Sequence, residues 1–446
     1  MKLFGTDGIR GVVGGPAISA LSVLKIGFAY GKFLKERFKS TSNPKIIIGK
    51  DTRISGYMLE SALESGLLAS GVDIILAGPL PTPAISHLVL SLRLQGGVVI
   101  SASHNPYEDN GLKFFDEFGN KLNDISENII EENYQNINYE TPSNFLGKAQ
   151  RIEDGVGRYI EFCKNSFSKS FNLKNFKLLI DCANGATYQI APKIFFELGA
   201  NVDLCNVSPD GKNINLNCGV LNPKLLIKKM EKSNYDYAIG FDGDGDRVIF
   251  IDKSGEVYNG DKLLYVLANF LNSSGKLKKT GVVGTQMTNL GIEEKFKEKN
   301  IQFTRTKVGD RYIIEELNRR NWFLGGESSG HIVNFPFHVT GDGILSSLQI
   351  LNIINLTGKN LSEHCIGLKI YPQKLHNIKL KNITEFKITD GLENLIEEIK
   401  QKNDGKIRIL IRKSGTEPVL RILVEGEDDS LFNNILDQIE KKIKEL

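Results

Sequence analysis

The stretch VISASHNPYEDNGLKFF, residues 99–115, joins an apolar run to a polar loop and then to a second apolar run. The first run, which begins at GGVV, predicts a buried strand. Almost nothing in the following Ser-Ala-Ser-His-Asn-Pro suits a hydrophobic core. A serine beside a histidine at a strand end is a candidate nucleophile or phosphate carrier. The same residue types also cap helices and turns, so this stretch alone leaves both interpretations open.

The composition indicates a globular chain with several domains and excludes two classes of partner. The chain has 446 residues, 41% of them hydrophobic and 24% charged, and single cores stop growing near ~250 residues. Its formal net charge is +3, with basic and acidic residues interleaved, so we expect no nucleic-acid partner. Because no run approaches the ~18 apolar residues of a membrane span and the N-terminus lacks a signal-peptide core, we expect no membrane partner and a cytoplasmic location.

Three segments of the chain share one plan, in which an apolar strand enters a polar, glycine-containing turn and then an amphipathic helix. These segments begin PKIIIGKDTRISG at 44–56, FKLLIDCANGAT at 176–187 and TGVVGTQMTN at 280–289. Further along each segment another strand ends in a polar loop, in VVISASHNP at 98–106, YAIGFDGDGDR at 237–247 and WFLGGESSGH at 322–331. Ligands of open α/β sheets collect at the carboxyl ends of strands, so the three loops could face one cleft.

The remainder, from about residue 370, predicts a smaller α+β unit with the loop RKSGTEP, residues 412–418, between its last two strands. We therefore expect an α/β fold of three similar mixed α/β sheet domains plus a smaller C-terminal α+β domain around one central cleft. The expected domains are 1–150, 151–252, 253–368 and 369–446, because polar or Gly/Ser/Asn-rich connections interrupt the apolar pattern there.

The loop FDGDGDR predicts a magnesium site. Asp242, Asp244 and Asp246 stand at alternate positions after an apolar strand, and three anions held together are costly without a cation. Hard carboxylate oxygens suit Mg²⁺. An EF-hand does not fit, because its sixth position would be Arg247 and its twelfth Lys253, where that motif requires Gly and Glu. An acidic surface turn and the aspartate pair of a HAD-type phosphatase remain as alternatives.

The loop RKSGTEP predicts a phosphate site. One guanidinium, two hydroxyls and unencumbered backbone N–H groups match a phosphate dianion, and they come from Arg412, Ser414, Gly415 and Thr416. Arg421 on the following strand could add a second charge. A polar β-turn without a ligand is the alternative, since Ser-Gly-Thr is common in turns.

The loop GGESSGH predicts a site for a polyhydroxylated ligand. If the segment is extended, Glu327, Ser329 and His331 share one face and present a carboxylate, a hydroxyl and an imidazole together. A glycine-rich turn with a satisfied histidine is the alternative.

Taken in order, SASHNP, DGDGDR, GESSGH and RKSGTEP resemble the motifs of the α-D-phosphohexomutase superfamily. FGTDGIRG at residues 4–11 resembles its bacterial phosphoglucosamine mutase branch, and the resemblance covers essentially residues 1–446. It implies that Ser103 is a phosphoserine, which completes the shell of one Mg²⁺ per chain begun by Asp242, Asp244 and Asp246. It further implies acid/base or charge-balancing roles close to the reacting groups for the side chains of Lys113, His104, His331, Arg10 and Arg247.

The reaction that the resemblance implies moves a phosphate across a sugar ring. Ser103 donates its phosphoryl group to glucosamine 6-phosphate, and the resulting 1,6-bisphosphate returns its other phosphate to the serine, leaving glucosamine 1-phosphate. A sugar 1,6-bisphosphate is thus both intermediate and activator, and the product supplies an amino-sugar precursor for cell-wall synthesis. RKSGTEP would hold the distal phosphate and GGESSGH the ring hydroxyls. Ser328 and Lys413 stand where the branch usually has Gln and Pro, and TKVGDR at 306–311 resembles a further substrate loop.

Two alternatives remain at this level. A phosphomannomutase or phosphoglucomutase of the same superfamily would use the same phosphoryl chemistry on another sugar. A non-catalytic phosphosugar-binding paralogue could lose Ser103 or a metal aspartate, and this chain has both. We expect a small-molecule phosphosugar as the partner and a monomer or a homodimer as the assembly.

Overall fold

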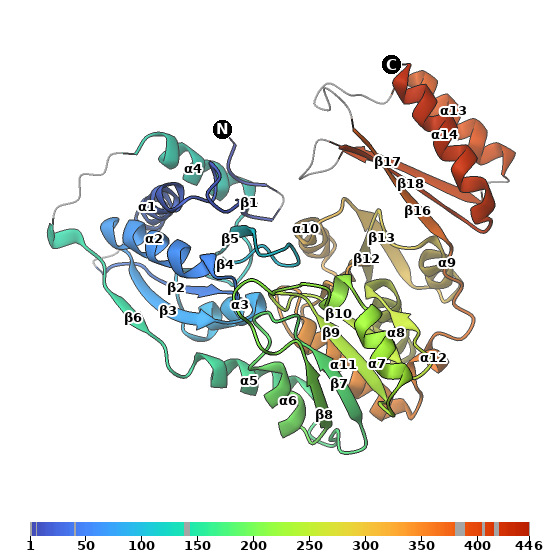
Figure 1. The fold of residues 1–446 in the computed structure, drawn as a ribbon, viewed down its shortest axis with the longest axis horizontal. Helices are drawn as coiled ribbons and strands as arrows, with labels where there is room; N and C mark the ends of the chain where they lie inside the picture. The colour runs from blue at the N-terminus through green and yellow to red at the C-terminus, as the bar shows by residue number, and fades with distance from the viewer. Residues whose placement is uncertain are drawn as a thin grey trace.

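The computed structural model describes residues 2–5, 7–39, 42–137, 143–379, 389–403, 406–413 and 419–445. Four sheets follow one another along these ranges, one in each of four domains (Figure 1). The expected fold class, three mixed α/β sheet domains plus a smaller C-terminal domain, is confirmed. Within the described ranges, no helix combines the length and the apolar character that crossing a membrane requires.

The first domain is built on a six-stranded sheet. Its strands and helices are β1 (Ile9–Val12), α1 (Ala20–Arg37), β2 (Lys45–Lys50), α2 (Ser55–Ala69), β3 (Asp73–Pro79), α3 (Thr82–Ser91), β4 (Gly96–Ile100), β5 (Asp109–Phe115), α4 (Asp124–Gln135) and β6 (Ala149–Arg151). The strand order is β1-β5-β4-β2-β3-β6, and β5 runs antiparallel to both of its neighbours. Ile46 and Ile48 of β2 pack on the side of α1 and α2, whereas Ile47 packs on the side of α3. Both faces are covered, which explains the unbroken apolar run of β2.

The second domain carries a five-stranded sheet in the order β11-β10-β9-β7-β8. Its elements are α5 (Gly155–Ser166), β7 (Lys177–Asp181), α6 (Ala191–Glu197), β8 (Asn201–Cys205), α7 (Lys224–Glu231), β9 (Tyr237–Phe241), β10 (Val248–Asp252) and β11 (Val257–Tyr258). β7 pairs in parallel with β8 and β9, whereas β9 and β10 form an antiparallel pair. The turn that joins this pair is the aspartate loop, residues 242–247.

The third domain carries a four-stranded sheet in the order β13-β12-β14-β15. Its elements are α8 (Gly260–Ser273), β12 (Gly281–Thr285), α9 (Leu290–Glu298), β13 (Gln302–Thr306), α10 (Asp310–Arg320), β14 (Leu324–Gly326), β15 (Ile332–Asn334), α11 (Gly343–Thr357) and α12 (Leu361–His364). β12 pairs in parallel with β13 and β14, and β14 pairs antiparallel with β15. GGESSGH therefore lies at the turn between β14 and β15.

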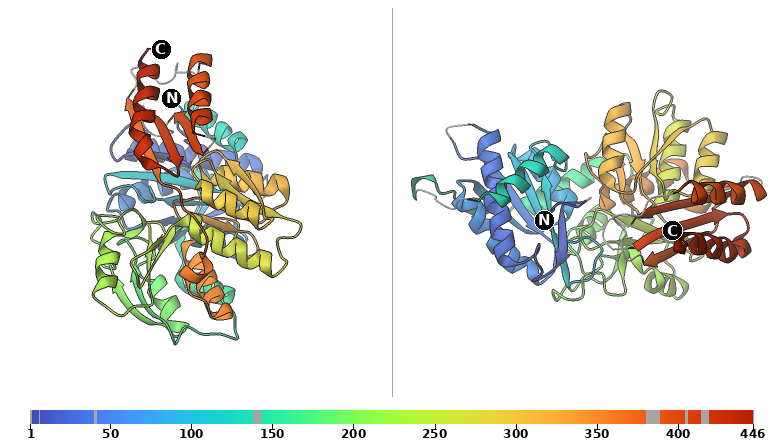
Figure 2. Two further views of the ribbon diagram at one scale, coloured as in Figure 1. Left: turned by 90° about the vertical axis from the view of Figure 1, so that its right-hand side faces the viewer. Right: turned by 90° about the horizontal axis from the view of Figure 1, so that it is seen from above.

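The C-terminal domain is a three-stranded antiparallel sheet with two helices. Its elements are β16 (Gln373–Lys379), α13 (Asp390–Lys402), β17 (Ile407–Lys413), β18 (Val419–Gly426) and α14 (Phe432–Lys444), and the strand order is β16-β18-β17. It lies beside the third domain (Figure 2). There the backbone N–H of Leu290 donates to Glu425 Oε1 over 2.9 Å, and the guanidinium of Arg408 donates to the carbonyl of Gln286 over 2.6 Å.

The C-terminal domain has an apolar core of its own, distinct from the core that the other three domains share. One buried cluster runs through all three larger domains and includes Ile47, Phe250 and Leu348. The C-terminal domain has its own cluster, in which Leu392 of α13 and Ile422 of β18 are fully buried. The first three domains are thus joined by shared apolar packing, which gives a firm support for loops that meet between them.

Candidate active site

Ser103 and the aspartate loop meet although they belong to different domains. Ser103 follows β4, and its Oγ donates a hydrogen bond of 2.7 Å to Asp242 Oδ2 at the end of β9. The same Oγ lies 3.2 Å from Nδ1 of His104. Ser103 is buried and its backbone is left-handed, with φ of 51°. The Ser103 hydroxyl is therefore held between a carboxylate and an imidazole.

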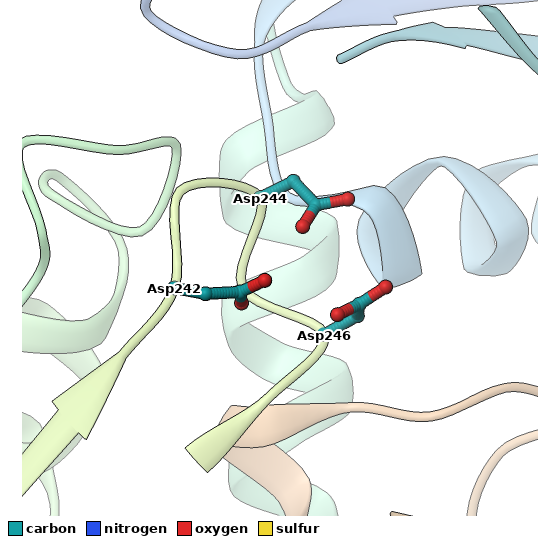
Figure 3. Close-up of side chains that lie close together, drawn as sticks. All are labelled: Asp242, Asp244 and Asp246. Carbon is teal, nitrogen blue, oxygen red and sulfur yellow. The ribbon is translucent and has the colours of Figure 1, made fainter. Parts of the chain in front are cut away.

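The three aspartates form a compact acidic cluster. Their ligand oxygens all lie within 4.8 Å of one another, and their carboxylates point to the same side of the turn (Figure 3). All three side chains are buried, which excludes the solvated surface turn. Burial, and then repulsion by Asp246 and Asp244, raises the pKa of Asp242 well above its ordinary value. Oδ1 of Asp244 and Oδ1 of Asp246 accept no hydrogen bond from the described residues. This donor set fits a hard divalent cation such as Mg²⁺.

Lys113 of β5 reaches the same cluster. Its Nζ lies 2.7 Å from Asp244 Oδ2, 3.3 Å from Asp246 Oδ2 and 3.5 Å from Asp7 Oδ2, and the side chain is 1% exposed. Burial lowers the pKa of Lys113, but Asp244, Asp7 and Asp246 together outweigh it and raise the pKa above its ordinary value. The lysine is therefore a buried cation and not a solvated strand residue.

Two arginines bring positive charge to the serine and aspartate loops. Arg247 Nε lies 3.8 Å from Asp246 Oδ1, and the Arg247 backbone N–H donates to Asp242 Oδ1 over 3.1 Å. Arg10 forms an ion pair with Asp7 in the N-terminal segment. Burial, with Arg247 and Arg10 nearby, lowers the pKa of His104 to about 3. His104 is consequently neutral at physiological pH and can accept a hydrogen bond.

The GGESSGH loop is a turn, so the condition of an extended segment, under which Glu327, Ser329 and His331 would share one face, is not met. The backbone N–H of Gly330 donates to the carbonyl of Glu327 over 3.0 Å, which closes residues 327–330 into a turn. Ser329 Oγ lies 3.5 Å from Glu327 Oε2. His331 is buried with its ring between Asp246, 3.6 Å from Nδ1, and Asp310, 3.5 Å from Nε2. The turn thus brings His331, at the end of the loop, against Asp246 of the aspartate cluster.

The loop TKVGDR also joins this region. The backbone N–H of Gly309 donates to Glu327 Oε1 over 2.9 Å, which orients the carboxylate. Lys121 of the first domain forms ion pairs with Asp310 and with Asp7. These contacts connect the third domain to the first across the site.

The predicted phosphate loop is described only in part. Ser414, Gly415 and Thr416 lie outside the described residues. Arg412 and Arg421 face each other as register partners on β17 and β18. Burial, and then Arg421, lowers the pKa of Arg412. Two guanidinium groups directly opposite one another repel, and a bound anion would relieve this repulsion.

Several residues at the site were missed by the sequence analysis. Asp7, which pairs with Arg10, Lys113 and Lys121, stands within FGTDGIRG, so its place in that motif was an available signal. The hydroxyl of Thr82, at the start of α3, donates a hydrogen bond to Asp244 Oδ2. No local pattern marks Thr82, because its partner lies in another domain.

Comparison with known proteins identifies the family. Models of phosphoglucomutase/phosphomannomutase match domain I at residues 1–141, domain II at 157–255, domain III at 259–370 and the C-terminal domain at 375–442. A phosphoglucosamine mutase from Paraburkholderia phymatum is 49% identical over 429 residues, which cover 95% of this chain and 94% of that protein. The chain belongs to the phosphoglucosamine mutases of this family. The resemblance expected from the motifs is confirmed, and the chain is an enzyme that acts on phosphosugars.

Solved structures of lower identity share the fold. A phosphoglucomutase/phosphomannomutase family protein from Burkholderia thailandensis has a TM-score of 0.80 at 23% identity, over 99% of this chain and 97% of that one. The N-acetylphosphoglucosamine mutase of Aspergillus fumigatus, solved with GlcNAc-6P and magnesium, has a TM-score of 0.63 at 19% identity, over 90% of this chain and 82% of that one. The four-domain arrangement is therefore common to this phosphoglucosamine mutase and distant phosphohexomutases.

Proposed function

We propose that this enzyme interconverts glucosamine 6-phosphate and glucosamine 1-phosphate through a phosphoserine at Ser103 and a 1,6-bisphosphate intermediate. The observation that carries the proposal is the 2.7 Å hydrogen bond from Ser103 Oγ to Asp242 of the acidic cluster. A hydroxyl held this way is positioned to carry a phosphoryl group between the two ends of a sugar. In each transfer, the bond from phosphorus to one oxygen breaks as the bond to the other forms, and the hydroxyl proton passes to a group of the protein.

Asp242, Asp244 and Asp246, with the phosphorylated Ser103, would hold one Mg²⁺ per chain. When bound, the ion would neutralise charge on the transferring phosphoryl oxygens. The buried, mutually repelling carboxylates support this assignment, as does the magnesium in the A. fumigatus relative.

Residues around the serine would balance charge and move protons. We propose that Arg10 and Arg247, which lie near the serine and aspartate loops, balance the negative charge of the phosphoserine. We propose that His104, Lys113 and His331 accept and return the protons of the serine and sugar hydroxyls. The contacts that support these roles are the 3.2 Å approach of His104 to Ser103 Oγ and the burial of Lys113 and His331 against the acidic cluster.

The substrate would be held from two sides. Glu327, Ser329 and His331 would bind ring hydroxyls, since they present a carboxylate, a hydroxyl and an imidazole beside the acidic cluster. The distal phosphate would be held by the cationic pair on β17 and β18 and by the loop between these strands, which together comprise Arg412, Ser414, Gly415, Thr416 and Arg421. A phosphate bound there would offset the repulsion between the two guanidinium groups.

The proposal extends to the setting of the reaction. A sugar 1,6-bisphosphate would activate the enzyme by phosphorylating Ser103. The product would enter amino-sugar synthesis for the cell wall, in the cytoplasm, and the enzyme would act as a monomer or a homodimer. The domains 1–150, 151–252, 253–368 and 369–446 would contribute the phosphoserine, the metal ligands, the sugar contacts and the distal phosphate contacts, respectively.

Substrate competition tests the proposed function. The isomerisation of glucosamine 6-phosphate is compared with that of mannose and glucose phosphates, with Mg²⁺ and a trace of sugar bisphosphate. We expect kcat/KM to be highest for glucosamine 6-phosphate. A higher kcat/KM for mannose or glucose phosphate would support a phosphomannomutase or phosphoglucomutase instead, and no turnover of any sugar would refute the proposal.

A further inference from the structure

The Ser103 loop adopts a backbone conformation that costs free energy. Ser103 has φ of 51°, in the left-handed region, which is unfavourable for a residue with a side chain. The loop turns tightly, because the backbone N–H of Asn105 donates to the carbonyl of Ala102 over 3.1 Å. This turn leaves the carbonyl oxygens of Ser103 and Asn105 available to the same donors. Such a conformation persists only where its surroundings hold it.

One side of the loop is held by Arg53 of the first domain. The Arg53 guanidinium donates to the carbonyl of Ser103 over 3.2 Å and to that of Asn105 over 2.6 Å. Arg53 is 1% exposed and forms a buried ion pair with Asp51. Asp51 in turn accepts from Ser101 Oγ over 2.6 Å. Ser101 Oγ accepts the backbone N–H of Ser103 over 2.9 Å, so the first domain fixes the loop at both its N–H and its carbonyl.

The other side is held by Asn215 of the second domain, in the segment between β8 and α7. Asn215 Nδ2 donates to the carbonyl of Ser103 over 2.9 Å and to that of Asn105 over 3.0 Å. Asn215 is itself fixed, because its backbone N–H donates to the carbonyl of Ala183 over 2.9 Å. The two carbonyls that Asn215 binds are the two that Arg53 binds, so donors from two domains hold one pair of acceptors.

The same contact includes the aspartate loop. A Cβ placed on Gly243 would lie 2.7 Å from the Ser103 carbonyl oxygen and 2.8 Å from Asn215 Nδ2. Only glycine permits this approach, so the aspartate loop packs directly on the Asn215 contact. The segments of Ser103, Asn215 and Gly243 therefore meet at one point, next to the residues that form the hydrogen bond from Ser103 Oγ to Asp242.

We propose that Asn215 is a positioning residue, which with Arg53 holds Ser103 in register with the aspartate loop of the second domain. The inference rests on the proposed phosphoryl transfer through Ser103. The Asn215 amide acts through the carbonyls of Ser103 and Asn105, which are backbone groups of the serine loop. Its loss should therefore displace the transferring oxygen without weakening the groups proposed to bind substrate, and a misplacement of about 1 Å can cost roughly 10²-fold in rate.

The test compares Asn215→Gly with Asn217→Gly. Asn217 stands two residues away in the same segment, is exposed, and has nearly the same left-handed backbone, with φ of 55° against 58° for Asn215. Glycine suits this conformation, so neither substitution strains the backbone. Asn215→Asp is the second variant, because it keeps the shape of the side chain and its tolerance of left-handed φ but removes the N–H donor.

Steady-state kinetics is measured in both directions, together with the single-turnover rate at which glucosamine 6-phosphate removes phosphate from phosphorylated Ser103. We expect both Asn215 variants to lose roughly 10- to 100-fold in kcat and in the single-turnover rate, with KM nearly unchanged. Asn217→Gly should match the wild type. Equal kcat in the Asn215 and Asn217 variants, or a loss confined to KM, would overturn the inference.

A wild-type control separates this inference from the proposed function. If the wild type carries no phosphate on Ser103 and does not isomerise glucosamine 6-phosphate, the proposed function fails and the inference fails with it. If the wild type does both and Asn215→Asp behaves like the wild type, only the positioning role is refuted.

Discussion

Lys113 Nζ lies 2.7 Å from Asp244 Oδ2, although Lys113 belongs to the sheet of the first domain and Asp244 to the hairpin loop of the second. Both side chains are essentially inaccessible to solvent, at 1% and 0% exposure. Removing one partner from a buried ion pair leaves the other charge uncompensated, which costs about 3–5 kcal/mol. The contact therefore joins two domains and also balances a cluster of carboxylates that repel one another.

Replacing this lysine should make stability depend on magnesium. Lys113→Met leaves Asp244 and Asp246 without their buried cation, so we expect a lower unfolding temperature in metal-free buffer. Mg²⁺ should raise that temperature more for the variant than for the wild type, because the ion supplies the missing charge. Thermal unfolding with and without Mg²⁺ measures the difference. Lys253→Met, at a lysine 62% exposed just after β10, is the control. An equal effect of Mg²⁺ on Lys113→Met and on the wild type would contradict this interpretation.

Neutralising an aspartate should weaken metal binding and turnover together. Asp244→Asn keeps the side-chain shape and removes one of three buried charges, so we expect weaker Mg²⁺ affinity and at least ~10²-fold lower turnover. Calorimetric titration with Mg²⁺ and steady-state kinetics measure the two effects. Asp203→Asn, at an exposed aspartate on β8 of the same domain, should change neither. Chelation should inactivate the wild type reversibly, and full activity in metal-free buffer would show that the aspartates serve only the turn.

The sequence was informative where local patterns carry the chemistry. SASHNP and FDGDGDR were each predicted to follow a strand, and the meeting of Ser103 with Asp242 agrees with the rule that ligand loops collect at carboxyl ends of strands. The burial of Lys113 could not be derived, because its partner Asp244 lies 131 residues further along the chain. Lys113 alternates with Leu112 and Phe114, and this pattern suits a solvated lysine on a strand equally well.

The shape of GGESSGH and the support behind Ser103 were also beyond the sequence. Alternate positions would place Glu327, Ser329 and His331 on one face only in an extended segment, but Gly330, with φ of 96°, closes a turn instead. Gly-Ser pairs are compatible with both conformations, so tertiary contacts decide between them. Asn215 carries no local signal, since its importance arises from the carbonyl oxygens of a loop in another domain.

The C-terminal arginine pair should serve the phosphate in both directions of the reaction. Arg412→Ala should raise KM for both glucosamine 6-phosphate and glucosamine 1-phosphate and lower kcat/KM by roughly 10- to 100-fold, because a charge-assisted contact is lost. Arg412→Lys keeps the charge without the forked geometry, so its kcat/KM should lie between that of Arg412→Ala and that of the wild type. Kinetics in both directions and the phosphate content of Ser103 by mass spectrometry provide the measurement. An effect on only one substrate would contradict a shared site, and loss of the phosphoserine would assign Arg412 to the transfer step.

A buried carboxyl in the third domain should make stability fall as the pH rises. Asp261 accepts the backbone N–H of Asn289 over 2.8 Å, and burial raises the pKa of Asp261 to about 7 from an ordinary 3.8. The folded protein therefore keeps a proton that the unfolded chain releases between these values, and the stability lost from pH 5 to pH 8 is on the order of 2 kcal/mol. Asp261→Asn is neutral throughout and should lose less stability over this range. Chemical unfolding of Asp261→Asn and of the wild type at pH 5 and pH 8 measures this difference. If the stability of the variant depended on pH as that of the wild type does, the raised pKa would be contradicted.

Removal of the phosphoryl carrier should abolish turnover while leaving the fold intact. Ser103→Ala loses the only oxygen that the proposed mechanism uses to hold the phosphoryl group, so we expect nearly all isomerisation to disappear. Ser65→Ala, at an exposed serine on α2, is the matched control and should retain full activity. Circular dichroism verifies that both variants fold, and near-wild-type turnover in folded Ser103→Ala would end the proposed mechanism.

Transfer of a labelled phosphate from Ser103 tests the central claim most directly. The enzyme is phosphorylated with a labelled sugar bisphosphate, freed of excess sugar and mixed with unlabelled glucosamine 6-phosphate, and the label is followed by mass spectrometry of the Ser103 peptide and of the sugars. The proposed mechanism predicts that the label leaves Ser103 at the rate of turnover and appears in glucosamine 1,6-bisphosphate and glucosamine 1-phosphate. A label that remains on the protein while the substrate is isomerised would contradict it.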